Sequence, residues 1–379
     1  SGPFENPILA SVEAHLESGV GDGMTDPPTL LVFAPTRRAA SETFIRANLR
    51  GLPFRVHAYF GDERPPMQPL RCLYGVAVLI SKAFTQLGWL RLASWPAALV
   101  ARLIVLCHQP DVVLAEFGFH AIRVMHVARW SGVPLVVHFR GSDASSESKF
   151  RRLEQRYRRL MQVASGFIVK SIPMRSTLQS LGAPTDRVLI SPSGADAALF
   201  QGASPETAPP TFLAVGRFVP KKGPLLTLAA FERLRRQLPE SLATACRLVM
   251  VGDGPMLEEA KRLVHQQSLT TQVRFAGVLS PAEIAALMRQ VRGFVQHSLV
   301  APDGDSEGSP VAVMEAQLSG LPVVATRHAG IPEVVMDGST GILVEEGDVQ
   351  AMANAMAQLV RNPQLAARLG AAGHERMSL

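Results

Sequence analysis

The chain has 379 residues, of which 47% are hydrophobic and 18% charged, and a formal net charge of +6. This composition can fill sizeable cores and excludes a wholly disordered chain, and the length favours two or more domains. The three cysteines, Cys72, Cys107 and Cys246, are far apart and lack the spacing of metal ligands, so we expect three reduced thiols.

The positive charge lies in the first half of the sequence. Residues 1–195 hold 22 Lys/Arg and 14 Asp/Glu, whereas residues 196–379 hold 16 and 18. A basic first half suggests an anionic partner, such as a phospholipid surface or a pyrophosphate-linked acceptor, although a solvated basic face would give the same count. Nucleic acid is not expected as a partner, because no nucleic-acid module is recognisable and aromatic residues make up only 6% of the chain.

The sequence predicts no membrane-spanning helix. The most apolar region, residues 73–106, is interrupted by Lys82, Arg91 and Arg102, and no uncharged apolar run approaches the roughly 18 residues that span a bilayer. Residues 1–27 lack the basic start and apolar run of a secretory signal, and their polar composition is that of a tail or tag. We therefore expect a cytoplasmic protein.

Residues 28–200 alternate short apolar runs with helical patterns, as in a parallel α/β sheet. The expected strands are 29–33, 112–115, 134–139, 166–169 and 188–190. The expected helices are 41–49, with Ser41 as N-cap, and 150–163, which carries a dense basic face over residues 151–159. These elements form the first expected domain.

A polar stretch with three prolines, residues 201–210, interrupts this pattern and is the expected linker. The alternation then restarts over residues 211–379. The expected strands are 212–215, 247–251, 273–275, 293–296, 322–325 and 341–344, and the expected helices are 225–236, 257–265, 281–288 with Ser280 as cap, 310–318 and 349–359. Two such units in tandem predict an α/β protein with two Rossmann-like domains that face each other across a ligand-binding cleft.

Residues 307–316, Glu-Gly-Ser-Pro-Val-Ala-Val-Met-Glu-Ala, lead from a polar loop into a helix that is expected to open at Pro310. Proline suits the first helical position, and the N–H groups of the first turn favour a diphosphate. Gly308 lets the backbone approach a ligand closely. Glu307 and Glu315 then offer two carboxylates to sugar hydroxyls, unless they are merely surface acids.

A second motif, residues 215–223, follows the first strand of the second half. Gly216 and Gly223 permit tight backbone geometry. Arg217 offers a planar fork for phosphate oxygens, and a lysine such as Lys222 offers a point charge. The alternative is a solvated basic loop.

A third motif, residues 138–143, ends the strand at 134–139 in the first half. It brings the imidazole of His138, the guanidinium of Arg140 and the carboxylate of Asp143 to the carboxyl end of a strand, where α/β sheets place their ligands. The alternative is a polar loop in which the aspartate is a cap.

Two other patterns are discounted. Residues 252–257 begin like a dinucleotide fingerprint, but Leu257 stands where a third glycine or alanine is needed, which argues against an NAD-dependent dehydrogenase. Asp303 and Asp305 form an acid-x-acid pair that could hold a divalent metal, but the basic loop already supplies charge for phosphates, so we expect no metal and no cofactor.

The motifs, in this order, resemble the retaining glycosyltransferases of family 4, which have the GT-B fold, and among them the exopolysaccharide or colanic-acid type. The resemblance extends over about residues 29–376. Arg217 and Lys222 stand at the family's Gly-Arg-x4-Lys-Gly spacing, and Glu307 and Glu315 stand at its Glu-x7-Glu spacing. Further matching segments are 252–255, 273–277, 320–326, 330–333 and 341–344.

The resemblance implies a role for each of the residues at these spacings. Arg217 and Lys222 would neutralise the donor diphosphate as it leaves, a large effect for such a reaction. Glu307 would contact the transferred sugar, and Glu315 would hold the nucleotide ribose. The anomeric configuration would be retained without a protein nucleophile.

The resemblance also implies binding by backbone groups. N–H groups from Ser309 through Pro310 to Val311 would line the sugar and phosphate, although the proline nitrogen itself has no hydrogen. The base would lie near Phe275 and Gly277.

The first half departs from the family pattern Thr-Phe-His-Gly-x-Asp. Arg140 stands at the position of the family histidine, and His138 lies two residues earlier, on the same face of the strand. Both therefore remain candidates for the histidine's role.

Taken together, these features predict a glycosyltransferase that moves a hexose from a nucleoside diphosphate sugar, with a UDP-sugar favoured and GDP-mannose as the alternative. The expected acceptor is a saccharide hydroxyl on a polyprenyl-pyrophosphate-linked exopolysaccharide intermediate at the inner membrane face. Residues 73–106 and the basic helix over 151–159 are the expected membrane contact. A GT-B sugar-nucleotide 2-epimerase and a non-catalytic nucleotide-sugar scaffold are the rival interpretations.

Overall fold

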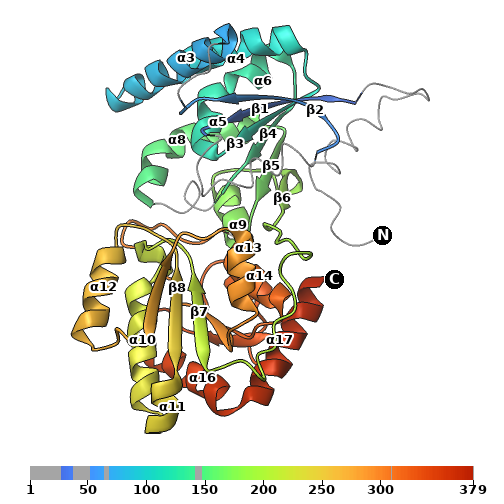
Figure 1. Cartoon of the computed structure of the whole chain (residues 1–379). Coiled ribbons are helices and arrows are strands. Elements are labelled where there is room, and N and C mark those ends of the chain that lie inside the picture. Colours follow the sequence, from blue (N-terminus) through green and yellow to red (C-terminus); the bar gives the residue numbers. More distant parts are fainter. Residues whose placement is uncertain (1–26, 37–51, 64–67, 141–146, 309, 379) are drawn as a thin grey trace. The chain divides into compact units, whose positions relative to one another are not determined.

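The computed structural model describes residues 27–36, 52–63, 68–140, 147–308 and 310–378, with the backbone alone for residues 147–152. The chain forms two compact units, which meet in the sequence after Ser191. Each unit is built on one six-stranded parallel sheet with helices packed against it (Figure 1). The expected tail up to residue 26 and the expected helix 41–49 lie outside the described residues.

The sheet of the first unit has the order β2-β1-β3-β4-β5-β6, with every pair parallel. Its strands are β1 (Thr29–Ala34), β2 (Arg55–Phe60), β3 (Val112–Glu116), β4 (Leu135–His138), β5 (Gly166–Val169) and β6 (Val188–Ile190). The five expected strands are confirmed to within one residue at each end. Strand β2 was not expected, because it is an edge strand in which Tyr59 alone is buried.

Helices cover this sheet. They are α3 (Pro69–Gln86), α4 (Trp95–His108), α5 (Gly118–Val124), α6 (His126–Ser131), α8 (Glu147–Val163) and α9 (Ile172–Ser180), with a 3-10 turn at Thr185–Arg187. The sequence did not reveal α3 and α4, because both are apolar on the outer face as well as on the buried one. In the part of the chain that the structure describes, no helix is both long and apolar enough to cross a bilayer.

The basic helix α8 differs from the expectation. Arg156 is buried, and its guanidinium donates hydrogen bonds to Ser94 Oγ (2.7 Å) and to the Ile122 carbonyl (3.2 Å). Arg158 pairs instead with Glu154 one turn away, at 2.8 Å. The dense basic face expected over residues 151–159 therefore does not include Arg156, which fixes the start of α4.

The sheet of the second unit has the order β12-β11-β10-β7-β8-β9, again with parallel pairs. Its strands are β7 (Thr211–Val215), β8 (Arg247–Val251), β9 (Val273–Gly277), β10 (Gly293–Gln296), β11 (Val323–Thr326) and β12 (Gly341–Val344). This is the strand order of dinucleotide-binding folds. All six strands were expected, and the structure confirms them to within two residues at each end.

The helices of the second unit were largely foreseen. They are α10 (Pro224–Arg236), α11 (Glu240–Ala245), α12 (Leu257–Gln266), α13 (Pro281–Met288), α14 (Val311–Ser319), α15 (Ile331–Val334), α16 (Val349–Arg361) and α17 (Pro363–Ser378), with a 3-10 turn at Pro220–Lys222. Ser280 is confirmed as a cap, because its side chain accepts the Glu283 N–H and its N–H donates to the Glu283 carboxylate.

Residues 201–210, the expected linker, lie within the second unit and are attached to it. The Ala203 N–H donates to the Ser319 carbonyl at 2.8 Å, and the buried Arg292 guanidinium donates to the Ala208 carbonyl at 3.1 Å. Just before the segment, Phe200 is buried in the apolar core of the same unit. The prolines therefore shape a segment that packs on this unit.

Candidate functional site

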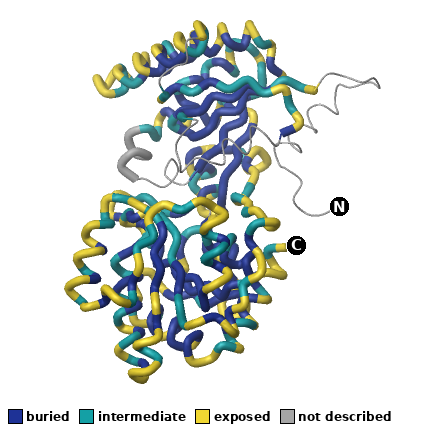
Figure 2. Tube along the Cα trace, in the orientation of Figure 1, coloured by how far each residue is buried: buried dark blue, intermediate teal, exposed yellow. Residues whose placement is uncertain are grey.

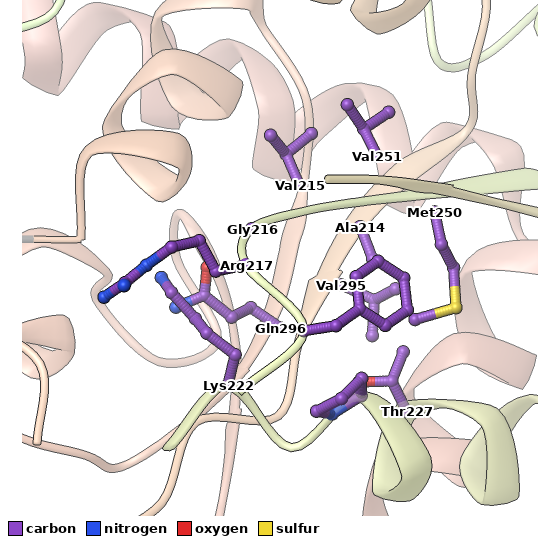
Figure 3. A pocket seen from close by; sticks show the side chains of 12 residues that line it. Ala214, Val215, Gly216, Arg217, Lys222, Thr227, Met250, Val251, Val295 and Gln296 are labelled. Atoms are coloured by element: carbon purple, nitrogen blue, oxygen red, sulfur yellow. The ribbon is translucent and has the colours of Figure 1, made fainter. Parts of the chain in front are cut away.

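A hollow lies where the strand order of the second sheet reverses, between β7 and β10. Such switch points leave a crevice at the carboxyl ends of the strands, which is where α/β sheets bind ligands. Residues 214–218, Lys222, Met250 and Gln296 are among those that line it (Figure 3). The side chains of Arg217 and Lys222 extend toward the same side of the hollow.

The loop after β7 is supported by the loop after β8. The Phe218 N–H donates to the Asp253 carbonyl (2.9 Å), and the Met256 N–H donates to the Phe218 carbonyl (3.0 Å). Gly252 has a φ of 133°, and a Cβ there would lie 2.1 Å from the Gly216 carbonyl oxygen. Only glycine allows this close approach. The Gly-Asp-Gly segment, residues 252–254, thus has a structural role that does not depend on dinucleotide binding.

A second close approach joins the β7 loop to the segment after β10. The 3-10 turn ends at Gly223, which has a φ of 50° and whose Cβ, if present, would lie 2.1 Å from the His297 carbonyl oxygen. The imidazole of His297 accepts the Gly347 N–H at Nε2 (2.9 Å), and burial lowers its pKa to about 4. Because His297 stays neutral, it is a fixed support of the loop.

Two adjacent lysines separate at this turn. Lys221 is buried, and its ammonium donates to Asp305 Oδ1 (3.1 Å) and to the Ser306 carbonyl (3.0 Å). Lys222 instead lies with its Nζ 3.0 Å from Oε1 of Glu307. Lys221 thus holds the loop before α14 in place, with Asp305 as its partner, and Lys222 carries the charge that lines the hollow.

Glu307 is only 7% exposed, and burial alone would raise the pKa of its carboxyl group. The charges of Lys222 and Lys221 outweigh this and hold that pKa below its ordinary value. The Glu307 N–H donates to Nε2 of His328 (3.1 Å), whose Nδ1 lies 2.6 Å from Glu346 Oε1. Since Nε2 accepts, the imidazole proton sits on Nδ1 and is donated to the Glu346 carboxylate.

Helix α14 begins one residue later than expected, at Val311, with Pro310 as its N-cap. Gly308 and Pro310 are both buried, and Ser309 lies outside the described residues. The N–H groups of a helix's first turn have no acceptor within the helix, so Val311 presents one at the end of this loop. The start of α14 therefore retains the geometry for an anion at its N-terminus.

Glu315 and the end of β9 complete the second-unit candidates. Burial raises the pKa of the Glu315 carboxyl to about 7, although the charge of Lys222 opposes the shift. The Gly277 carbonyl accepts the Gly252 N–H (2.7 Å), and the Phe275 ring lies 5.9 Å from the Phe218 ring. Both residues thus adjoin the loops that frame the hollow.

In the first unit, the carboxyl ends of β3 and β4 bring a buried charge cluster together. The strand register places Glu116 opposite His138. The Arg140 guanidinium donates to both carboxylate oxygens of Glu116, at 2.9 and 3.3 Å, and its Nη2 lies 3.0 Å from His138 Nδ1. His138 and Arg140 do therefore share one face, as expected, but Arg140 is held by a carboxylate that the sequence did not reveal.

Burial dominates the charge states of this cluster. It lowers the pKa of His138 to about 4 and that of Lys170 to about 7, and in Lys170 the charge of Arg140 adds to the effect. The neutral His138 accepts from Arg140 at Nδ1, which places its proton on Nε2. Lys170 donates to the Ser191 carbonyl at 2.9 Å. Asp143, the third member of the motif, lies outside the described residues.

Sequence reasoning missed four residues of these sites. Glu116 and Lys170 each sit at or directly after the end of a buried strand, which is the signal that could have found them. His328 lies two residues after the end of β11. Gln296 ends β10, is 4% exposed, and has an amide oxygen without a partner among the described residues. Such an oxygen is suited to accept a hydrogen bond from a ligand in the hollow.

Comparison with known families covers both units. Residues 45–199 match the model of Glycosyltransferase Family 4, and residues 197–376 match the model of Glycosyl transferases group 1. The chain therefore carries a family 4 glycosyltransferase domain followed by a group 1 glycosyltransferase domain. The family resemblance drawn from the motifs is confirmed, and so is the GT-B fold class with two Rossmann-like units.

Individual relatives agree with this assignment. A protein named as a colanic acid biosynthesis glycosyltransferase of Salmonella typhimurium is 31% identical over 256 residues, 66% of this chain and 62% of the relative. A GDP-mannose-dependent phosphatidylinositol monomannoside mannosyltransferase of Mycolicibacterium smegmatis is 34% identical over 43% of this chain and 42% of its own. The chain thus spans less than two thirds of the length of these relatives.

A solved structure extends the likeness in fold to nearly the whole chain. The crystal structure of Anabaena HepE in complex with UDP and glucose superposes with a TM-score of 0.68 at 19% identity, and covers 93% of this chain and 95% of its own. At this identity the likeness concerns the fold.

Proposed function

We propose that this protein is a retaining glycosyltransferase that moves a hexose from a nucleoside diphosphate sugar to a hydroxyl group of a saccharide acceptor. The observation that carries the proposal is the ion pair of Lys222 with the buried Glu307 beside Arg217, at the switch point of the second sheet. A UDP-sugar is the favoured donor, because HepE of the same fold was solved with UDP and glucose, and GDP-mannose is the alternative.

The charges of the site suit the departure of a diphosphate. Negative charge accumulates on the leaving phosphates as the glycosidic bond breaks, and fixed cations stabilise that charge most where water is excluded. Arg217 and Lys222 line the hollow, and the N-terminus of α14 presents backbone N–H groups. The Glu307 carboxylate, whose pKa is held low, accepts hydrogen bonds from sugar hydroxyls in this proposal.

The acceptor part of the proposal rests on the relatives and on the charge of the first half. The Salmonella relative is named for colanic acid biosynthesis, and residues 1–195 have eight more basic than acidic residues, 22 against 14. A lipid-linked exopolysaccharide intermediate, carried by a polyprenyl pyrophosphate at the inner membrane face, fits both. His138 and Arg140 remain proposed contacts on the acceptor side.

The proposal is tested by calorimetric titration of the chain with UDP, GDP and ADP, followed by NMR of the matching donor sugar. We expect one nucleotide to bind at micromolar affinity, and its donor to remain unchanged until an acceptor saccharide is added. Conversion of the donor alone to an epimeric sugar would identify a 2-epimerase. Absence of binding to all three nucleotides would refute the donor site.

The affinity for UDP-glucose is expected to rise with pH up to about 7 and then level off. Burial raises the pKa of Glu315 to about 7 in the empty site, and the ionised carboxylate is the better acceptor for two ribose hydroxyls. At one unit below that pKa only about a tenth of the carboxyl is ionised, so binding should weaken by up to roughly tenfold. The measurement is calorimetry from pH 5.5 to 8.5.

The Glu315→Gln variant is the control for this titration. Its amide does not ionise, so its affinity should be lower near pH 8 and independent of pH. The raised pKa also makes the stability of the ligand-free protein depend on pH. The protonated Glu315 contributes its full stabilisation below its ordinary pKa of 4.5, and this contribution is lost as the pH rises through about 7. Identical pH profiles for both proteins would remove Glu315 from the ribose site.

A further inference from the structure

Helices α3 and α4 expose an unusual amount of apolar surface. Of the seventeen exposed large hydrophobic side chains among the described residues, eleven lie between residues 73 and 106. Leu79, Leu87 and Leu106 are 61%, 65% and 60% exposed, and Trp89 is 55% exposed. Clusters of this kind on a protein surface mark a binding face.

The two helices are apolar on both sides, which separates them from ordinary surface helices. Their inner sides bury residues such as Tyr74 and Ile104 in the core of the first unit. Their outer sides repeat exposed apolar residues at helical spacing, as with Val76 and Ile80 in α3, or Leu99 and Leu103 in α4. Figure 2 shows this alternation as exposed segments along one edge of each helix and buried segments along the other.

The charge of this region is of one sign. Residues 64–110 contain no Asp or Glu. Lys82 is paired with an aspartate before α3, at 2.9 Å, whereas Arg91 and Arg102 are exposed beside the apolar residues. Apolar side chains flanked by arginines are complementary to the surface of a bilayer that contains anionic lipids.

Aromatic side chains support the same partner. Trp89 and Trp95 are about half exposed, at 55% and 46%, and lie at the linked ends of the two helices. Tryptophan favours the boundary between hydrocarbon and water, where its ring is apolar and its N–H finds a polar partner. The buried Arg156, which donates to Ser94 Oγ, holds this end of α4 to the rest of the unit.

We propose that the outer face of α3 and α4, residues 69–108, binds laterally to a membrane that contains anionic phospholipid. A second copy of the chain is a poorer occupant, since a symmetric contact would oppose the arginines of one copy to those of the other. Insertion is shallow, because neither helix is long and apolar enough to cross the bilayer. This binding needs no nucleotide, so it can be tested independently of the proposed function.

The test is flotation of the chain with vesicles of phosphatidylcholine alone and of phosphatidylcholine with phosphatidylglycerol. The test variant, Leu79→Glu with Leu103→Glu, places two acids on the outer face at side chains 61% and 49% exposed. The control variant, Ile172→Glu with Val278→Glu, adds the same charge at side chains elsewhere that are 48% and 70% exposed. Thermal melting checks that both variants fold.

We expect the chain to bind the anionic vesicles at least tenfold more tightly than the neutral ones, and to bind less as salt increases. The test variant should lose at least tenfold in binding to anionic vesicles, and the control variant should keep it. Equal binding by both variants, or no vesicle binding by the unaltered chain, overturns the proposal. Light scattering that shows a dimer split by Leu79→Glu with Leu103→Glu also overturns it, because a second copy would then cover the face.

Discussion

Replacement of Lys222 by alanine is expected to weaken UDP binding by at least tenfold, about 1.4 kcal/mol, and to reduce sugar transfer by about a hundredfold or more. Lys222 lines the hollow and lies 3.0 Å from Glu307. Its loss removes a cation from the departing diphosphate and leaves a buried carboxylate with less compensation. Calorimetry with UDP and a transfer assay measure the two effects separately.

The same variant should change the protonation of Glu307. Lys222 exerts the largest of the influences that lower the pKa of this carboxyl, and burial acts in the opposite direction. Without Lys222 the pKa of Glu307 is expected to rise, so any remaining activity should need a higher pH than that of the unaltered chain. A pH profile of the residual activity tests this sign.

Two further variants make the Lys222 experiment specific. Lys222→Arg keeps the positive charge and should restore much of the affinity that alanine loses. Lys261→Ala removes an exposed lysine of α12 that pairs with Glu258, and should change neither binding nor transfer. If Lys222→Ala bound UDP as tightly as the unaltered chain, the diphosphate site would lie elsewhere.

The strands could be predicted from the sequence because parallel strands are buried on both faces and appear as short apolar runs. Strand β1, in which Leu30 to Ala34 are all buried, is an example. Helices α3 and α4 were not predicted, because residues 73–106 form one long apolar region in which the outer positions of both helices are apolar as well. The property that hid these two helices is the one from which the membrane contact is inferred.

Only those residues of the candidate site that belong to short sequence motifs could be predicted. The motif placed Lys222 in the basic loop, but the sequence could not show that the adjacent Lys221 binds Asp305, 84 residues later. In the first unit, Glu116 and Arg140 are 24 residues apart and meet only because β3 and β4 are neighbours. Partners of this kind depend on strand order and register, which a short motif does not contain.

Glu116→Gln is expected to lower the free energy of unfolding of the first unit by about 3–5 kcal/mol at pH 7, since it breaks a buried ion pair on one side. Glu116 is 1% exposed, and its two oxygens accept bonds of 2.9 and 3.3 Å from Arg140. The amide would remove the negative charge that this guanidinium contacts, near Lys170. All three tryptophans, Trp89, Trp95 and Trp130, lie in this unit, so urea unfolding followed by tryptophan fluorescence reports on it.

The pH dependence of this stability has a definite sign. Burial raises the pKa of Glu116, but His138, which becomes charged below about pH 4, and Arg140 outweigh burial and hold that pKa well below its ordinary value of 4.5. Because its pKa is lower in the folded chain, the ionised Glu116 carboxylate stabilises the fold above pH 4.5, and this stabilisation is lost as the pH falls through the folded-state pKa. The pKa of His138 is about 4 in the folded chain, against an ordinary value of 6.5. Between these two pH values the unfolded chain binds a proton that the folded chain does not, so the free energy of unfolding falls further as the pH is lowered from 6.5 to 4.

Glu154→Gln provides the matched comparison, because it breaks an exposed ion pair with Arg158 that lies one helical turn away. Such pairs contribute less than about 1 kcal/mol, so this variant should unfold almost as the unaltered chain does. The difference between the two variants in the free energy of unfolding then shows how much more it costs to neutralise a buried carboxylate than an exposed one. Similar small losses in both would mean that water reaches Arg140 when Glu116 is replaced, and the cluster would then be a solvated site and not a fixed part of the core.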